Sequence, residues 1–192
     1  GAQNKERMRE SWPSFQRRPQ ICRINYRDFP ENGGSMAIER TLVLIKPDGM
    51  QRHLAGLAID RLENTHMELV GAKIATVTDK LAREHYALLE GKGPFVDKKL
   101  FEHLINFIKG EYHGDPKRRV MALVYQGENA VQSIRTAGGL TNPEDASPDT
   151  IRGAFGRICR KHGYFENVVH ASGNLEEAAR EINIWFRPTV WN

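Results

Sequence analysis

The sequence predicts an α+β fold: a ferredoxin-like antiparallel four-stranded sheet (split β-α-β) covered by helices, with a long loop before the fourth strand. Apolar runs and amphipathic segments alternate in the order β-α-β-(αα)-β-α-β-α, which contains the split β-α-β unit of ferredoxin-like folds. Residues 140–166 show neither pattern and are interrupted by Gly and Pro, as is typical of a long functional loop. This order predicts an antiparallel sheet with helices on one face.

Two strands and one helix are predicted in the first part of the domain. Residues Arg40–Lys46 form a compact apolar run that is typical of a strand buried on both faces. Pro47-Asp48-Gly49 ends this run, and a helix follows from Leu54 to about Leu62. Residues Leu69–Val77 are rich in Val, Ile and Ala and predict the second strand.

The middle of the chain predicts three helices and the third strand. Asp79 is expected to cap a helix that ends at residues 91–94, and a second helix carries apolar residues at helical spacing from Leu100 to Ile108. Residues Val120–Tyr125 predict the third strand. A helix over Asn129–Thr136 ends at Gly138-Gly139, which is a typical C-terminal cap.

A strand, a polar turn and a helix close the domain. The fourth strand is predicted over Asn167–Ala171, and the last helix runs to about Ile184. Asn174 and Glu177 approximate a capping box at the start of that helix. His170 ends the strand and faces a helix start, where an anion is favoured. Imidazole is a nucleophile whose unperturbed pKa leaves it largely neutral at pH 7, although a lone histidine at a strand end is more often structural.

Composition excludes several classes of protein. The chain has 192 residues, enough for one good core, and no apolar run approaches the roughly 18 residues of a membrane span. The net charge is +4, but the first 35 residues hold seven basic and four acidic residues, so the rest is nearly neutral and a nucleic-acid-binding face is not predicted. Two distant cysteines favour a reducing, cytoplasmic location.

Residues 1–35 are expected to be an N-terminal extension or tag that is either partly disordered or packed on a neighbour. They show no sustained hydrophobic period, and Pro30-Glu31-Asn32-Gly33-Gly34-Ser35 is typical of a flexible linker. Four acidic residues argue against a transit peptide. The domain itself is expected over residues 36–192.

Six motifs occur in series along this domain. They are Lys46-Pro47-Asp48-Gly49 with Gln51-Arg52, Pro94-Phe95, Thr141-Asn142-Pro143, Thr150-Ile151-Arg152-Gly153, Asn167-Val168-Val169-His170-Ala171-Ser172, and Glu181-Ile182 with Trp185-Phe186. Each motif alone is weak, but their order and spacing are specific. On the basis of these six motifs, residues 38–188 resemble a nucleoside diphosphate kinase from end to end.

The resemblance implies a ping-pong reaction through a phosphohistidine. His170 matches the histidine that takes the γ-phosphate of a nucleoside triphosphate, mostly ATP, and passes it to a nucleoside diphosphate. Such a transfer needs positioning and cations more than covalent help from the protein. The implied Mg²⁺ arrives with the nucleotide phosphates, so no metal ligands are expected from the chain. A homo-oligomer, tetramer or hexamer, is also implied.

The remaining site residues are assigned by the same resemblance. The phosphates are contacted by cations and a hydroxyl, the sugar by an amide, and the base by an aromatic ring on which every base can stack. An acid orients the histidine, a serine supports that acid, and a tyrosine lies near the histidine. In that order the residues are Lys46, Arg135, Arg152 and Thr141, then Asn167, Phe95, Glu181, Ser172 and Tyr86.

Simpler explanations exist for each residue taken alone. Lys46 would more often be a solvated strand end, Arg135 a complement to a helix dipole, and Phe95 a small core anchor. The other six histidines are expected to be structural or exposed, since none lies in a matching motif. Jointly, the ordered matches favour the catalytic interpretation.

Two alternatives to an active kinase can be tested on the sequence. A nucleic-acid-binding ferredoxin-like sheet would expose aromatics on its strands, but the strands around Leu42–Ile45 and Val120–Val124 are aliphatic. An inactive homologue would lack the histidine or a phosphate cation, and all are present.

Some positions depart from the usual pattern of the family. Gly173 and Ala154 stand where acids are common, and the segment Gly93-Pro94-Phe95-Val96 lacks an Arg and a second Phe. The stretch Gly156–Glu166 is a few residues longer and basic, and the tail after Phe186 is short.

Overall fold

A computed structural model of the chain describes residues 37–114, 119–160 and 163–187. The predicted extension, residues 1–35, lies outside the described residues, so the proposed domain boundary stays a prediction. Within the described part of the chain, no helix combines the length and apolar character that crossing a membrane requires.

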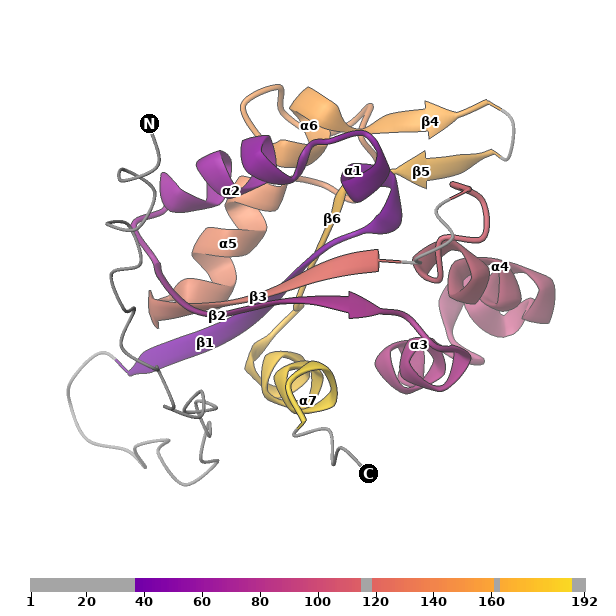
Figure 1. The fold of residues 1–192 in the computed structure, drawn as a ribbon, viewed down its shortest axis with the longest axis horizontal. Helices are drawn as coiled ribbons and strands as arrows, with labels where there is room; N and C mark the ends of the chain where they lie inside the picture. The colour runs from indigo at the N-terminus through magenta and orange to yellow at the C-terminus, as the bar shows by residue number, and fades with distance from the viewer. Residues whose placement is uncertain (1–36, 115–118, 161–162, 188–192) are drawn as a thin grey trace, which may run out of the picture. The chain divides into compact units, whose positions relative to one another are not determined.

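Four strands form one antiparallel sheet (Figure 1). They are β1 (Ile38–Ile45), β2 (Glu68–Thr76), β3 (Arg119–Glu128) and β6 (Val169–Ala171), in the spatial order β2-β3-β1-β6. β1 therefore lies inside the sheet, paired with β3 along its whole length and with β6 at its carboxyl end. The predicted antiparallel ferredoxin-like sheet is confirmed.

One face of the sheet packs on three helices. Alternate residues of β1, β3 and β6 form a buried cluster with α2 (Ala55–Glu63), α5 (Ala130–Gly138) and α6 (Ile151–Phe155). The sheet contributes Val43, Ile45, Leu123, Tyr125, Val169 and Ala171, and the helices Ala58, Leu62, Ile134 and Ile151.

The opposite face carries α7 (Leu175–Trp185), with α3 (Asp79–Tyr86) beside it (Figure 1). Leu44 lies directly opposite His170 in the pairing of β1 with β6, so both side chains share this face, and His170 contacts Glu181 of α7. The prediction of helices on one face only is therefore wrong. Because β1 is apolar on both of its faces, both need a cover, as the apolar run of β1 itself implied.

Several element ends differ from the predictions. Thr78, not Asp79, caps α3, because its Oγ1 accepts a hydrogen bond from the amide of Leu81 at 3.2 Å. The α3 helix ends at Tyr86 rather than near residue 91, and a short helix, α1 (Pro47–Gln51), precedes α2. The helix α4 (Lys98–Ile108) lies where it was predicted.

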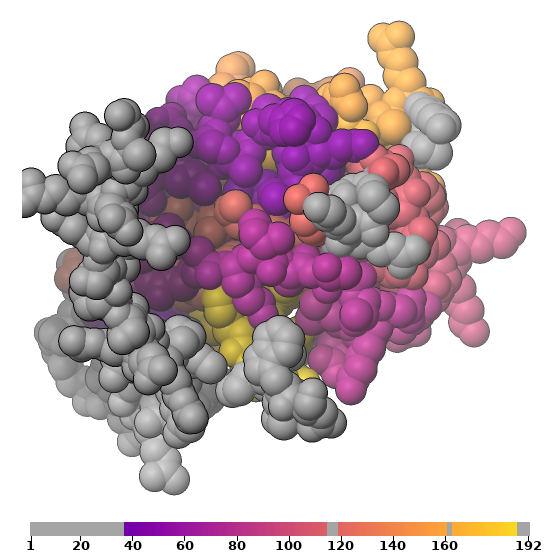
Figure 2. Space-filling view, viewed as in Figure 1, coloured from indigo at the N-terminus to yellow at the C-terminus, as the bar shows by residue number. Residues whose placement is uncertain are grey.

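The segment 140–166 is more ordered than a loop. It contains α6 and a hairpin of β4 (Arg157–Cys159) and β5 (Tyr164–Glu166). In the space-filling view, orange atoms of this part of the chain lie at the upper right edge of the surface (Figure 2). The sequence did not predict it, because strands of three residues carry too little periodicity to detect.

Gly139 provides a test of the packing between α5 and α6. Its φ of +83° is unfavourable for other residues, and a Cβ would lie 2.7 Å from Cβ of Thr150. We expect Gly139→Ala to lower the free energy of unfolding by at least about 1–2 kcal/mol. The neighbouring Gly138→Ala is the matched control, because a Cβ there meets open space inside a helix. Equal melting temperatures for the two variants would contradict this account.

Candidate active site

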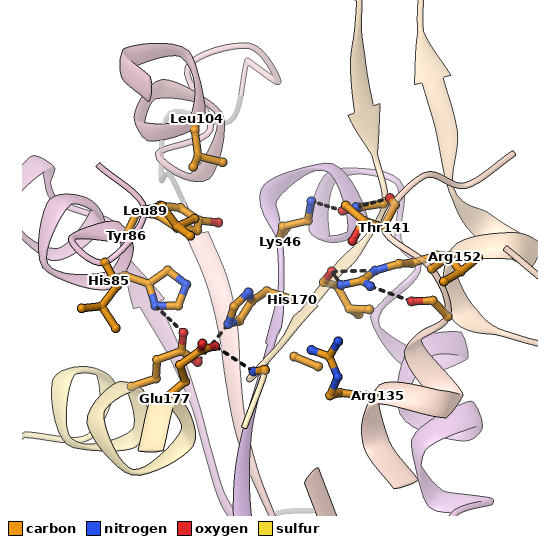
Figure 3. A pocket seen from close by; sticks show the side chains of 18 of the residues that line it. Lys46, His85, Tyr86, Leu89, Leu104, Arg135, Thr141, Arg152, His170 and Glu177 are labelled. Atoms are coloured by element: carbon orange, nitrogen blue, oxygen red, sulfur yellow. Dashed lines mark hydrogen bonds and ion pairs between the residues drawn. The ribbon is translucent and has the colours of Figure 1, made fainter. Parts of the chain in front are cut away.

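A cavity of about 420 Å³ opens between α3, α7 and the carboxyl end of β1. It brings together residues that lie far apart in the sequence, and all but one of the predicted site residues line it: Lys46, Tyr86, Phe95, Arg135, Thr141, Arg152, Asn167, His170 and Glu181. Ser172 lies behind this lining, against Glu181. Figure 3 shows the His170 ring between two groups of side chains, with His85, Tyr86 and Leu89 on one side and Lys46, Thr141 and Arg152 on the other.

The His170 ring is held by a carboxylate on α7. Its Nε2 lies 2.9 Å from Oε2 of Glu181, and its side chain is 20% exposed. Because Nε2 is engaged in this way, Nδ1 is the ring nitrogen that can react with a molecule in the cavity. A partly exposed imidazole with one fixed nitrogen is suited to nucleophilic chemistry.

Glu181 is a buried carboxylate with two donors on one oxygen. Ser172 donates from Oγ to the same Oε2 at 2.7 Å, and the Ser172 hydroxyl also accepts the amide of Leu42 in β1 at 3.3 Å. Burial raises the pKa of Glu181, but the charge and hydrogen bond of His170, together with His85 and Ser172, outweigh burial and lower this pKa to about 2. The carboxylate is therefore ionised at neutral pH.

His85 is a site residue that the sequence interpretation missed. It was expected to be structural, yet its ring meets the His170 ring edge-on with centroids 4.5 Å apart. Its Nδ1 accepts the indole N–H of Trp185 at 3.2 Å, and burial and the charge of His170 lower the pKa of His85 to about 3. His85 is thus a neutral ring in a fixed position beside His170. The one available signal was its place next to Tyr86.

Three donor groups in this cluster could also be metal ligands. Among the residues that the structure describes, one cluster of three potential metal ligands occurs: His85, His170 and Glu181, whose ligand atoms lie within 4.8 Å of one another. Nε2 of His170 is already engaged with Glu181, and Nδ1 of His85 already accepts the indole N–H of Trp185. The arrangement therefore fits a hydrogen-bonded network better than a metal centre.

Cations gather at one end of the cavity. Lys46 is only 7% exposed, contrary to a solvated strand end, and its Nζ donates to Oδ1 of Asn167 and lies 4.7 Å from the centre of the Phe107 ring. Burial lowers the pKa of Lys46, while nearby Asp48 opposes that shift. A buried ammonium of this kind can bind an anion strongly.

Arg152 and Arg135 complete the cationic end. Arg152 donates to the carbonyl of Gly139 at 2.7 Å and to that of Val169 at 3.0 Å. Burial and the charge of Arg135 lower the pKa of Arg152 to about 10, so it stays charged at neutral pH. Arg135 itself is exposed in the last turn of α5. Three cations thus face the region beside His170, where a phosphate chain would be stabilised.

The other end of the cavity is apolar. Phe95 lies in a 3₁₀ turn (Gly93–Val96), half-buried, with its ring centre 6.3 Å from that of Phe101 in α4. Leu88, Leu89 and Leu104 add aliphatic lining to the cavity. A cationic end and an apolar end on either side of a reactive imidazole suit a ligand that carries both phosphates and a flat base.

Comparisons with known proteins point to one family. Residues 39–190 match the family model described as nucleoside diphosphate kinase. The chain is 41% identical to the nucleoside diphosphate kinase of Staphylococcus saprophyticus over 150 residues, which cover 78% of this chain and 89% of the relative. It is 44% identical to that of Symbiobacterium thermophilum, with 78% and 87% covered.

Two solved structures are similar in fold. A nucleoside diphosphate kinase from Borrelia burgdorferi, a transition-state mimic with bound vanadate and ADP, has a TM-score of 0.70 at 33% identity, with 80% of this chain and 90% of that one covered. A halophilic nucleoside diphosphate kinase from Halobacterium salinarum, in complex with CDP, has a TM-score of 0.65 at 36% identity, with 80% and 93% covered.

The depressed pKa of Glu181 predicts a pH dependence of stability. A carboxylate whose pKa falls from 4.5 to about 2 on folding stabilises the fold fully above pH 4.5 and loses that contribution as the pH falls toward 2. The contribution at neutral pH is roughly 3 kcal/mol. We expect the stability advantage of wild type over Glu181→Gln to shrink between pH 4.5 and 2 in chemical denaturation. The exposed Glu90→Gln should show no such trend; a parallel trend in both variants would contradict the assignment.

Proposed function

The chain belongs to the nucleoside diphosphate kinase family and transfers a phosphoryl group from nucleoside triphosphates to nucleoside diphosphates, and we propose that His170 carries that group as a phosphohistidine on Nδ1. One observation carries this assignment: Nε2 of His170 is held by the ionised Glu181, which leaves Nδ1 for a ligand in the cationic cavity. Nδ1 attacks the γ-phosphorus, the bond to the bridging oxygen breaks, and the diphosphate leaves. A terminal oxygen of a second diphosphate then attacks that phosphorus, the bond between phosphorus and Nδ1 breaks, and the neutral imidazole is restored.

The cavity supports distinct roles for its other residues. Lys46, Arg135 and Arg152 supply the positive charge that a loose phosphoryl-transfer transition state needs. Thr141 offers a hydroxyl to the phosphates. Asn167, fixed by the backbone carbonyl of Thr141 at 2.7 Å, offers an amide to the sugar.

Two aromatic side chains complete the proposed site. Phe95 supplies a flat ring at the apolar end, where a base can stack whatever its identity. The relatives from Borrelia and Halobacterium bind an adenine and a cytosine nucleotide respectively, which supports acceptance of several bases here. Tyr86 stays protonated, because burial and the charge of Glu181 raise its pKa, and its ring centre lies 6.5 Å from that of His170.

Mg²⁺ is proposed to reach the site on the nucleotide. The donor set that could ligate a metal within the described part of the chain is engaged in the His170 network, so the ion would be held mainly by phosphate oxygens. When bound, it neutralises part of the phosphate charge.

The cytoplasmic location inferred from the cysteines, and the limits of the domain at residues 36–192, stay predictions.

A homo-oligomer is proposed from the free edge of the sheet. β2 lies at one edge, and none of the described strands adjoins its outer side. Leu69 and Ile74 of β2 are 40% and 51% exposed, and Leu57 of the neighbouring segment α2 is 50% exposed. A long apolar edge strand in a folded protein is normally covered, because it otherwise promotes aggregation. We propose that a second copy of this chain covers it; tetramer or hexamer stays open.

Intact-mass analysis tests the phosphohistidine. Incubation with ATP and Mg²⁺ should add one acid-labile phosphate to the wild type, and addition of a different nucleoside diphosphate should remove it. His170→Ala should not be labelled and should lose nearly all turnover, while it remains folded and still binds a non-hydrolysable ATP analogue. His66→Asn, at an exposed histidine, is the control and should behave as wild type. Phosphoryl transfer by His170→Ala would disprove the proposal.

Sedimentation tests the proposed subunit contact. The double variant Leu69→Lys with Ile74→Lys places two charges on the β2 edge, so we expect it to sediment as a smaller species than the wild type. The control is Leu175→Lys, at a leucine of similar exposure on α7. A wild type that sediments at the monomer mass of 21.9 kDa, or an unchanged double variant, would rule out this contact.

A further inference from the structure

Val168 has a backbone conformation that β-branched residues rarely adopt. Its φ is +66°, in the left-handed region that normally favours glycine, and its side chain is fully buried. It stands between Asn167 and the strand that carries His170. A strained residue persists only where its surroundings hold it, so the contacts of Val168 identify what holds it.

Residues 46–49 hold Val168 from three sides. The amide of Lys46 donates to the Val168 carbonyl at 2.8 Å, and the Val168 amide donates to Oδ2 of Asp48, also at 2.8 Å. Gly49 lies so close that a Cβ on it would be 2.9 Å from Cγ1 of Val168 and 3.2 Å from its carbonyl oxygen. Asp48 is fully buried and does not line the cavity, so its carboxylate serves the backbone and not a ligand.

The backbone conformation of Val168 determines where the residues before and after it in the chain are placed. Before it, Asn167 contacts Lys46 and the backbone carbonyl of Thr141. After it, the carbonyl of Val169 accepts from Arg152, and His170 follows. A change of φ at Val168 would therefore move the proposed nucleophile, the proposed sugar contact and a carbonyl that anchors a cation.

We propose that Asp48 and Gly49 are positioning residues: they hold Val168 in the left-handed conformation and thereby align His170 with the phosphate-binding cations. This inference rests on the proposed role of His170. It gives a physical reason for Asp48 and Gly49 in the Lys46-Pro47-Asp48-Gly49 motif that is independent of contact with nucleotide.

A competing explanation is that Asp48 acts through its charge. The carboxylate lies near Lys46 and opposes the loss of its proton. Asp48→Asn separates the two explanations, because the amide oxygen of Asn can accept the same hydrogen bond from Val168 without the charge. Positioning predicts that Asp48→Asn stays close to wild type, whereas a charge effect predicts that it fails like Asp48→Ala.

The test measures single-turnover formation of phosphohistidine from ATP and Mg²⁺, with kcat and KM alongside. Asp48→Ala should slow the reaction about 100-fold, the cost of a small misplacement of reacting groups, mostly in kcat. Adding Val168→Gly to Asp48→Ala should recover most of the lost rate, because glycine adopts a positive φ without support. Val168→Gly alone should change the rate little. Thermal unfolding of each variant checks that it folds.

Gly49→Ala tests the same contact from the other side. It should push against Val168 and slow phosphohistidine formation, and adding Val168→Gly should recover part of the lost rate, because it removes the closest contact, the one with Cγ1. Gly56→Ala is the matched control, because a Cβ there meets nothing within 4 Å. This pair keeps the inference testable if Asp48→Ala does not fold.

The outcomes distinguish this inference from the function on which it rests. A wild type that forms no phosphohistidine on His170 would overturn both proposals. Normal labelling of wild type, with equal rates in Asp48→Ala and Gly49→Ala, would overturn the positioning role alone. Folded, slow variants that Val168→Gly does not rescue, or a failing Asp48→Asn, would overturn it as well.

Discussion

The antiparallel register of β1 and β6 is the constraint on which the candidate site depends. Leu44 pairs with His170 and Ile45 with Val169, and the hydrogen bond from the Lys46 amide to the Val168 carbonyl continues the pairing. A slip of one residue would turn His170 toward the core on α2 and α5 and remove it from Glu181. β6 has only three residues, so bonds beyond its ends must fix this register. Ser172 supplies them at the other end, through its amide and its hydroxyl to Leu42.

The electrostatics of the site follow from which groups are charged behind the reactive ring. Glu181 stays ionised in a buried position because His170 and Ser172 both donate to it, which offsets the cost of its desolvation. His85, equally buried, stays neutral because burial disfavours its charged form and nearby His170 disfavours that form further. The Glu181 carboxylate and the neutral His85 ring therefore lie on one side of the His170 imidazole. The positive charge of the site is concentrated on the other side.

Periodicity predicted the strands well, and local chemistry predicted some of the ends. The Asn174 side chain does accept the amide of Glu177 at 2.9 Å, and Gly139 does take a positive φ at the end of α5. Tertiary features were not predictable in this way. The cover over the second face, the contact of His85 with His170, and the short hairpin of β4 and β5 depend on residues far apart in the chain. The left-handed conformation of Val168 was equally unpredictable, because that conformation is typical of residues such as Gly, Asn and Asp and not of valine.

The strained turn at Val168 also shows why the site cannot be assembled from local structure alone. A left-handed β-branched residue costs on the order of 1–3 kcal/mol. The two hydrogen bonds to its backbone each return about 0.5–1.5 kcal/mol. These amounts nearly cancel, so the turn has little stability of its own and needs both bonds, one from the Lys46 amide at the end of β1 and one to the Asp48 carboxylate. The geometry around His170 therefore forms together with the sheet, because the bond from the Lys46 amide exists only once β1 and β6 have paired.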